Sequence, residues 1–408
     1  MGNYLDLSPR VYFVNILALG HKLYAVGRGL AMTLALIFAF YYSKELGVLS
    51  RSYLVMIMTS SILISTSLTS GTTLTLRNFG KQKTPNENMR SFHSLILLEI
   101  LIGILLFFFS LLAFSEFKYP LHPSLFSISL LYFIVSAAHL IAFEILISCA
   151  AFKALAISEI VTIILQILSY FIIGTMLELS IAVRVLTSFI FSYSVILVST
   201  FIYLRRNYRY EVQFGNPMTY LGLSKGNHTL GIVLGIVDRF DRVIIAWSLP
   251  LILLGKYAIM SSCISFFRFV PETLGKLIVS SKSNSLHKYL QLKFIWLWVF
   301  VLISVAVICL QAFISLFFGP DWLLSWSIAF VFALQELARG MFQLTTNYKV
   351  AVGDSLTVHR AAKYLLFMTG PLAIILSQWL GVIGVPLGFL ISYVYVLLFV
   401  VRVRGHRV

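Results

Sequence analysis

Four charged residues interrupt an otherwise apolar segment in the middle of the chain. Residues 228–250 are apolar enough to span a bilayer, yet they contain Asp238, Arg239, Asp241 and Arg242. A charged side chain near the bilayer centre costs about 2.5–3.5 kcal/mol on insertion scales, so such residues face one another or a polar interior. At about 100° per residue the four charges fall on one side of a helix. The segment therefore predicts a helix with one polar face.

Two interpretations of this polar face remain open. Asp238 and Arg242 are one helical turn apart, so they could form an ion pair that only holds helices together. Alternatively, the charged face lines a hydrated cavity that handles a polar ligand. The cavity is favoured, because Asp241 and Arg239 add charges on the same face that a single structural pair does not need.

The other arginines inside apolar segments extend this pattern. The chain carries 31 lysines and arginines, and the five that fall inside predicted spans, more than four residues from either end, are all arginines. Arginine stays charged when desolvated and presents a planar fork suited to phosphate or carboxylate, so this choice favours an anionic ligand. The candidate substrate-binding residues are Arg28, Arg239, Arg242, Arg268 and Arg339.

Acidic residues close to these arginines are candidates for charge pairing or for coupling to an ion. Glu272 lies one turn after Arg268. Glu336 lies three residues before Arg339, so each glutamate could serve only as a local ion-pair partner. Arg28 has no acidic residue three or four positions away, which leaves snorkelling to the membrane surface as its structural explanation. The candidate coupling or charge-pairing residues are Asp238, Asp241, Glu272 and Glu336.

The sequence shows no pattern of catalytic or metal-binding residues. Cys149, Cys263 and Cys309 fall in or beside separate apolar segments, without CxxC or Cys/His spacing. There is no Asp-x-Asp motif, and the loops expected on the outer side are short. We therefore expect no catalytic residue, no cofactor and no metal, and a protein that is not an enzyme.

Composition indicates a polytopic membrane protein. Of the 408 residues, 59% are hydrophobic and only 11% charged, and the mean hydropathy is +0.93. A helix that spans a bilayer needs about 20 apolar residues. The windows that meet this requirement are 23–42, 53–76, 94–115, 125–148, 154–176, 181–204, 228–250, 253–279, 294–317, 323–346, 362–379 and 381–401. The predicted fold class is all-α, with about twelve transmembrane helices.

A polar and basic segment divides these windows into two sets of six. We expect residues 1–207 to form an N-terminal six-helix bundle, residues 208–224 a cytoplasmic linker and residues 225–408 a C-terminal six-helix bundle. A faint repeat supports this division, because Leu46-Gly47 and Leu254-Gly255 both occur between the first and second spans of their half. Transporters commonly place a substrate path between such repeats.

The distribution of basic residues predicts the orientation. With the N-terminus inside, 21 lysines and arginines fall in the expected cytoplasmic segments and only five in the outer segments. Because cytoplasmic loops retain positive charge, both termini are expected in the cytoplasm. Topology and attraction to anionic membrane lipids account for the net charge of +16, so no nucleic-acid partner is needed.

Short motifs recur at the ends of the predicted spans and at their charged centre. They are Leu46-Gly47 with Arg51-Ser-Tyr53, Val237-Asp238-Arg239-Phe240-Asp241-Arg242, Leu254-Gly255-Lys-Tyr257, Leu316-Phe-Phe-Gly319-Pro-Asp-Trp322 and Trp379-Leu-Gly381-Val-Ile-Gly384-Val-Pro-Leu-Gly388. Together they resemble the polysaccharide flippases, a family that includes the Wzx-like O-antigen flippases and belongs to the multidrug/oligosaccharidyl-lipid/polysaccharide exporter superfamily. The Asp/Arg cluster followed by Leu-Gly-x-Tyr is the most specific element. The chain departs from the family at Ser50-Arg51-Ser52, where another glycine is usual.

The resemblance implies a V-shaped fold of two six-helix bundles in a bacterial inner membrane. It also implies that an undecaprenyl-diphosphate-linked oligosaccharide, the repeat unit of O-antigen or of another surface polysaccharide, is moved from the cytoplasmic to the periplasmic leaflet by alternating access. The implied partners are membrane lipids, a coupling ion (proton or sodium) and polysaccharide polymerase and chain-length proteins.

Two other functions are compatible with parts of the pattern. A drug or cation antiporter of the same superfamily would share the fold but would usually need more unpaired acids than arginines inside. A membrane-embedded glycan polymerase would need catalytic residues in a larger loop outside the hydrocarbon.

Overall fold

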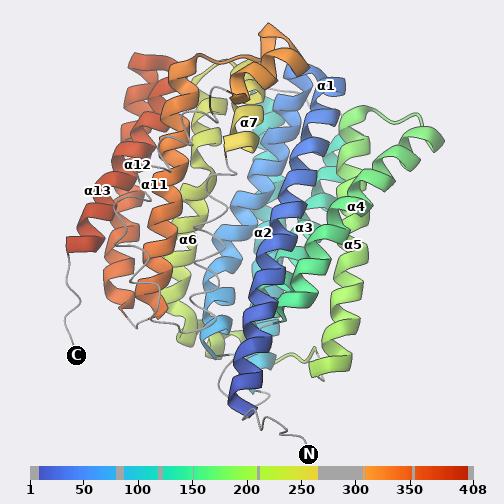
Figure 1. The fold of residues 1–408 in the computed structure, drawn as a ribbon, viewed down its shortest axis with the longest axis vertical. Helices are drawn as coiled ribbons and strands as arrows, with labels where there is room; N and C mark the ends of the chain where they lie inside the picture. Colours follow the sequence, from blue (N-terminus) through green and yellow to red (C-terminus); the bar gives the residue numbers. More distant parts are fainter. Residues whose placement is uncertain are drawn as a thin grey trace, which may run out of the picture.

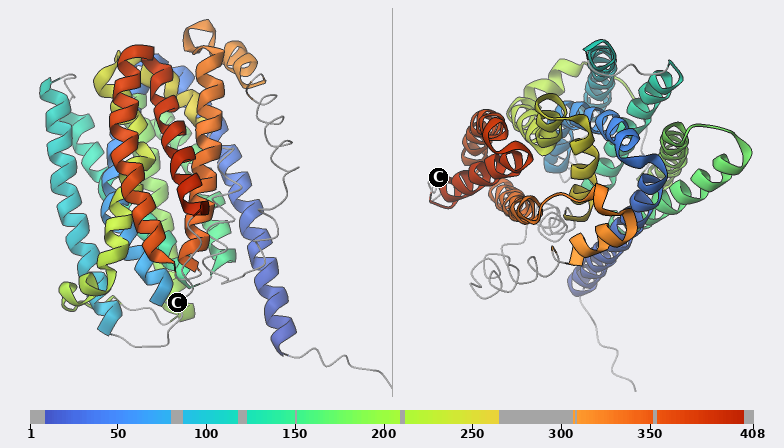
Figure 2. Two further views of the ribbon diagram at one scale, coloured as in Figure 1. Left: turned by 90° about the vertical axis from the view of Figure 1, so that its left-hand side faces the viewer. Right: turned by 90° about the horizontal axis from the view of Figure 1, so that it is seen from above.

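The computed structural model describes residues 9–79, 87–117, 123–149, 151–208, 212–264, 307, 309–351 and 354–402. Within these ranges every regular element is helical. The long helices run side by side, and most turns between them lie at the two ends of the molecule (Figures 1 and 2). The prediction of an all-α fold is confirmed for this part of the chain.

The helices follow the predicted spans closely. The first seven are α1 (Pro9–Phe79), α2 (Glu87–Phe117), α3 (Pro123–Ser148), α4 (Phe152–Met176), α5 (Ile181–Tyr208), α6 (Pro217–Ser248) and α7 (Leu251–Ile264). After a short helix over Cys309–Phe318, the chain continues with η2 (Pro320–Trp322), α11 (Trp326–Ala351), α12 (Ser355–Leu380), η3 (Gly381–Ile383) and α13 (Gly384–Arg402). Most of the spans predicted at 253–279 and 294–317 lie outside the described residues.

The long element α1 contains the first two predicted spans. Its two helical parts join at Gly47, where φ is +73° and the backbone is not helical. Glycine adopts this left-handed conformation without the steric penalty of a Cβ atom, so the chain can reverse there. The first glycine motif therefore forms a turn between spans. The second glycine motif, Leu254-Gly255, does not form such a turn, because Gly255 lies inside α7 and packs against the backbone of Val48.

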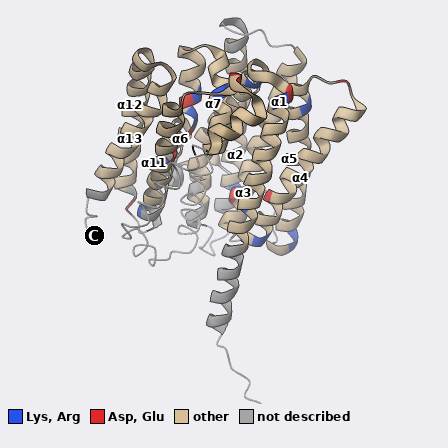
Figure 3. Ribbon diagram, turned by 45° about the horizontal axis from the view of Figure 1, so that its top comes forward, with Lys and Arg blue, Asp and Glu red and all other residues tan. Residues whose placement is uncertain are grey.

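The chain is a multi-pass membrane protein. Six helical segments, lying within α1 to α5 and within residues 356–400, are long and apolar enough to cross a membrane. On α2 the side chains of Leu101, Leu105 and Phe109 are exposed, as expected of a face turned towards lipid. Acidic and basic residues are sparse over the described ribbon (Figure 3). α6, with 32 residues, and α11, with 26, are also long enough to cross a membrane, but they carry the charged residues that form the site.

The second part of α1 lies directly against α6. A Cβ atom built on Gly231 would be 2.3 Å from the backbone nitrogen of Gly71, and one on Gly235 would be 2.6 Å from that of Ser67. A real Cβ atom could not lie so close to a backbone nitrogen. The two helices can therefore approach this closely only because Gly231 and Gly235 have no side chain, as small residues commonly allow in membrane proteins. This contact, the α1–α6 seam, joins the two halves expected from the sequence.

The start of α6 lies inside the range expected as a linker. Asn216 caps the helix by accepting a hydrogen bond of 3.0 Å from the backbone N–H of Met218, and Pro217 occupies the first turn. Both are favourable at a helix N-terminus. Residues 217–224 are therefore helical, and the division of the chain into two bundles stays a prediction.

Candidate functional site

A cavity of about 290 Å³ lies between α1, α5, α6, α7 and α11. Its charged lining residues are Arg51, Asp238, Arg239, Asp241, Arg242, Glu336 and Arg339. The structure thus brings six of the nine candidate residues, from two separate segments of the sequence, to one place. We call this space the charged cavity.

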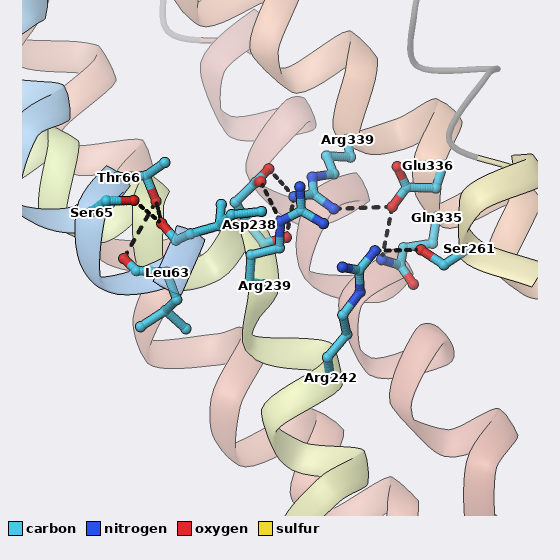
Figure 4. A network of polar contacts seen from close by, with 11 residues as sticks. Leu63, Ser65, Thr66, Asp238, Arg239, Arg242, Ser261, Gln335, Glu336 and Arg339 are labelled. Atoms are coloured by element: carbon cyan, nitrogen blue, oxygen red, sulfur yellow. Dashed lines mark hydrogen bonds and ion pairs between the residues drawn. The ribbon is translucent and has the colours of Figure 1, made fainter. Parts of the chain in front are cut away.

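Arg339 holds two carboxylates together in the wall of this cavity (Figure 4). One nitrogen of its guanidinium contacts Asp238 of α6, and another lies 3.0 Å from Glu336 on its own helix. Asp238 also lies 3.4 Å from Nε of Arg239. Two arginines and two carboxylates therefore form one continuous ionic network. The predicted local pair of Glu336 and Arg339 is present.

Arg242 lies beside this network, with its guanidinium group extended towards Ser261 (Figure 4). Its Nη2 donates a hydrogen bond of 2.8 Å to Ser261 of α7. Asp241 and Glu336 act on Arg242 electrostatically, but its buried Nε makes no hydrogen bond within the described part of the chain. Asp238, expected from its spacing to pair with Arg242 one turn along, instead meets Arg339 from a different helix. Arg242 consequently retains donor capacity towards the cavity.

Asp241 is held by a tyrosine. The hydroxyl of the fully buried Tyr257 donates a hydrogen bond of 2.9 Å to Oδ2 of Asp241. Both residues belong to the motifs quoted above, the Asp/Arg cluster and the Leu-Gly-x-Tyr that follows it. The spacing of these motifs therefore reflects a direct contact between α6 and α7.

Arg51 is a cavity residue that sequence reasoning placed in an outer turn. It is only 4% exposed, and its guanidinium carbon lies 4.7 Å from the ring centroid of Tyr42. Nε and Nη1 of Arg51 are buried and make no hydrogen bond to any described residue. The sequence contained one indication that Arg51 is unusual: the segment Ser50-Arg51-Ser52 carries a basic residue where the resembling family usually has a glycine.

The cavity carries more cations than anions among its described lining residues. Arg51, Arg239, Arg242 and Arg339 face Asp238, Asp241 and Glu336. Arg239 and Arg339 form ion pairs within the network, whereas Arg51 and Arg242 lie outside it and each have at least one buried nitrogen without a hydrogen bond in the described structure. An arrangement of this kind suits an anionic group that accepts several hydrogen bonds.

Arg28 occupies a second space next to the first. This space, of about 330 Å³, is enclosed by α1, α3, α4 and α5, and we call it the aromatic cavity. Arg28 Nη1 lies 3.4 Å from Glu159 of α4 and donates a hydrogen bond of 2.9 Å to the Tyr24 hydroxyl. The side chains of Arg28 and Glu159 are both 14% exposed, so Arg28 is largely covered by the helices rather than extended to the surface.

Two candidate residues, Arg268 and Glu272, lie outside the described residues. The described part of the chain contains no group of three or more His, Cys, Asp or Glu side chains placed to bind a metal ion.

Comparisons with known proteins give a fold. No family model matches the chain, and no curated protein matches its sequence. A lipid II flippase MurJ structure in an inward closed conformation covers 95% of this chain and 86% of its own, with a TM-score of 0.68 and 16% identity. A point mutant of the Vibrio cholerae MATE transporter VcmN covers 95% of this chain and 97% of its own, with a TM-score of 0.65 and 15% identity.

The eukaryotic MATE transporter AtDTX14 is also similar, covering 94% of each chain with a TM-score of 0.65 and 12% identity. The chain has the fold of these transporters and flippases. This confirms the fold class predicted from the sequence. At such identities the likeness concerns the fold, and the cargo has to be argued from the cavities.

Proposed function

We propose that this protein is a flippase that moves an undecaprenyl-diphosphate-linked oligosaccharide from the cytoplasmic to the periplasmic leaflet of a bacterial inner membrane by alternating access. The observation that carries the proposal is the charged cavity, in which arginines outnumber carboxylates and Arg51 and Arg242 keep buried donors unused. A diphosphate offers several acceptor oxygens and at least one negative charge to such donors.

The physical problem of lipid-linked glycan export matches this cavity. Moving an ionised diphosphate through hydrocarbon is prohibitive unless other groups replace its hydration shell. Guanidinium groups replace water well, because each presents a planar fork of donors and stays charged when desolvated. The diphosphate would therefore pass through the charged cavity while the lipid tail stays in the bilayer.

A drug or cation antiporter is the second candidate. The MATE transporters among the similar structures support it as strongly as MurJ supports a flippase. The charge of the cavity separates the two, because four arginines against three carboxylates disfavour a cationic drug and favour an anion. A glycan polymerase would share neither the fold of these proteins nor the need for this cavity.

The energy source and the partners form part of the same proposal. An interior-negative potential favours outward movement of negative charge by about 2.3 kcal/mol per charge per 100 mV, so a proton or sodium gradient can assist but is not required. After translocation the cargo would pass to polysaccharide polymerase and chain-length proteins on the outer side.

Depletion of the protein tests the proposal. Cells that lose it should accumulate lipid-linked oligosaccharide that a glycosidase added outside spheroplasts cannot reach, and re-expression should make this pool accessible. The control is the same cells with a block in glycan synthesis, in which no pool forms. If depleted cells keep a normal accessible pool, the flippase assignment is wrong. Increased drug retention in such cells would favour the antiporter.

A further inference from the structure

The aromatic cavity adjoins the charged cavity. The two spaces share the lining residues Met32, Ala35, Tyr42 and Phe189. Its volume of about 330 Å³ falls within the roughly 300–1,000 Å³ of typical ligand pockets. A molecule whose anionic group sits in the charged cavity can therefore extend its next part into the aromatic cavity.

Aromatic rings form one wall of this cavity. The His139 ring is stacked on the Tyr193 ring, with centroids 4.2 Å apart and planes inclined by 20°. The centroid of the Phe143 ring also lies 4.2 Å from that of His139. The ring centroid of Phe189 lies 5.7 Å from that of Tyr193, and Phe189 also lines the charged cavity, so it extends the wall in that direction. Flat rings at such a position provide a large and rigid apolar contact area.

Polar groups are placed among these rings. His139 is only 7% exposed, and its Nε2 makes no hydrogen bond within the described part of the chain. Gln166, only 1% exposed, also lines the cavity and interacts with the Tyr193 hydroxyl. A buried polar atom without a partner costs about 1–3 kcal/mol, and a ligand that supplies the partner removes that penalty.

The lining therefore combines ring faces with neutral hydrogen-bonding groups. A purely apolar ligand would leave His139 Nε2 unsatisfied, while a diphosphate would meet few cationic groups here, since Arg28 lies close to Glu159. A sugar ring meets both requirements, because one face carries C–H groups that pack on aromatic rings and its edge carries hydroxyl groups. Amide and imidazole side chains hydrogen-bond such hydroxyls as donors or acceptors.

We propose that the aromatic cavity, with His139, Gln166 and Tyr193, is a sugar-binding subsite that holds a pyranose ring of the glycan while the adjoining diphosphate occupies the charged cavity. This inference rests on the proposed function, since it names the part of the same cargo that fills the second space. Recognition of the cargo thus has two separable components, one for charge and one for sugar.

The test compares two lipids on the purified protein in nanodiscs. The probes are bare undecaprenyl diphosphate and the lipid-linked oligosaccharide extracted from cells depleted of the protein, and the readout is the Kd of each. We expect the wild type to bind the glycosylated lipid about tenfold or more tightly than the bare one. Gln166→Leu should remove most of this difference and leave the Kd for the bare lipid unchanged, because a hydroxyl-binding group is lost and the arginines are not.

Three further variants make the test specific. Tyr193→Phe keeps the ring and should lose less than Tyr193→Leu, which removes the stacking surface as well. Tyr364→Leu, on an exposed ring of α12, is the control and should bind both lipids as the wild type does. An unchanged Kd for the bare lipid shows in each variant that the protein is folded.

The outcomes separate the two proposals. Equal binding of the two lipids by the wild type would overturn the sugar subsite and leave the flippase proposal standing. A Gln166→Leu variant that binds both lipids as the wild type does, or that loses both in equal measure, would overturn it as well. Failure of the wild type to bind either lipid would overturn the proposed function, and the subsite with it.

Discussion

Arg51 and Arg242 are the arginines of the charged cavity that lie outside the ionic network. Both are part of the lining, and both have buried guanidinium nitrogens without a hydrogen bond in the described structure. Charge-assisted hydrogen bonds contribute about 1.5–3 kcal/mol each, or roughly 10- to 100-fold in binding. These two arginines are therefore the positions where a diphosphate gains most.

We predict that Arg242→Ala lowers glycan export at least about tenfold at near-normal membrane abundance. Arg242→Lys should restore export only in part, because lysine keeps the charge but loses the planar fork. Arg206→Ala, an exposed arginine near the end of α5, is the matched control and should export normally. The measurement is surface glycan per unit of membrane protein, and full export by Arg242→Ala would remove this residue from the mechanism.

Arg339 tests whether the ionic network is structural. Arg339→Leu takes from Glu336 an ionic partner at 3.0 Å in a site where both side chains are at most 5% exposed. Breaking a buried pair on one side typically costs about 3–5 kcal/mol, whereas replacing both partners by apolar residues is often neutral. We predict that Arg339→Leu strongly lowers membrane abundance and that Glu336→Leu/Arg339→Leu restores both abundance and export, because Asp238, the other carboxylate that Arg339 contacts, keeps Arg239 as an ionic partner at 3.4 Å. Restored abundance without export would instead show that Arg339 contacts the cargo, as its sequence position predicts.

At the residue level, spacing predicted that the four charges of α6 share one face, but not which side chains they contact. Asp238, Arg239, Asp241 and Arg242 were placed on one helix face, and they do line one cavity. Pairing across helices is invisible to spacing, so the contact of Asp238 with Arg339, 101 positions away, could not be found in this way. Arg51 was missed for a related reason, since an arginine near a span end is assigned to a loop by default.

Among the elements, the α1–α6 seam sets how the two halves of the chain meet. Glycines at 71, 231 and 235 allow backbone contact between the helices. Nearby, Glu99 of α2 accepts a hydrogen bond of 2.5 Å from Thr72 and lies 3.1 Å from Nε2 of His228, which adds a polar contact between α1, α2 and α6. The seam therefore depends on small residues at fixed positions.

We predict that Gly231→Leu destabilises the protein, because its Cβ atom would fall 2.3 Å from the Gly71 nitrogen and the helices would have to separate. Overpacking of this kind typically costs about 1–3 kcal/mol. Gly222→Leu, on the same helix with open space around the Cβ position, is the control and should be neutral or slightly stabilising. The thermal unfolding midpoint in detergent distinguishes them, and equal midpoints would show that the seam tolerates a side chain.

The start of α12 depends on Asp354. Its side chain accepts a hydrogen bond of 3.3 Å from the Thr357 N–H and lies 3.0 Å from Lys349 Nζ. Burial acts to raise the pKa of Asp354, but the bonds from Thr357 and Lys349 outweigh it and hold the pKa below its ordinary value. The carboxylate therefore stabilises the fold above its unfolded pKa of about 3.9, and this contribution is lost as the pH falls through the lower folded pKa.

We predict that Asp354→Ala speeds amide exchange in the first turn of α12 about fivefold at neutral pH, the effect of losing a cap worth about 1 kcal/mol. Asp354→Asn, which can still cap, should show a smaller change. The difference between the wild type and Asp354→Ala should shrink once the pH is low enough to protonate the carboxyl. Exchange followed by mass spectrometry measures both effects, and a difference that persists unchanged at low pH would contradict the ionised cap.

Helix positions were the part of the fold that the sequence predicted best. A transmembrane helix must satisfy its own backbone hydrogen bonds and stay apolar, so its signal is local. The three turns at Gly47, Gly319 and Gly381, all with positive φ, also fall in motifs recognised from the sequence. Cavities were not predictable in the same way, because the aromatic cavity joins side chains from four helices that are each ordinary for a membrane protein.

At the scale of the whole molecule, the arrangement of the helix ends restricts the topology. The first residues of α1, the connection from α5 to α6 and the last residues of α13 all lie at the same end, opposite the turns at Gly47 and Gly381 (Figure 1). Elements at one end of a membrane protein with these long helices lie on one side of the bilayer. The structure therefore predicts that these three points share a compartment, and the 21 to five distribution of basic residues predicts that this compartment is the cytoplasm.

We predict that reporter fusions after Arg209 and at Val408 both report a cytoplasmic location. A fusion in the turn at Gly381, at the opposite end, should report the periplasm and provides the internal control. Because three positions are tested, the two parts of the argument can fail separately. Opposite signals from Arg209 and Val408 would contradict the arrangement of the helices, whereas a consistent reversal of all three would leave the fold intact and overturn the charge rule.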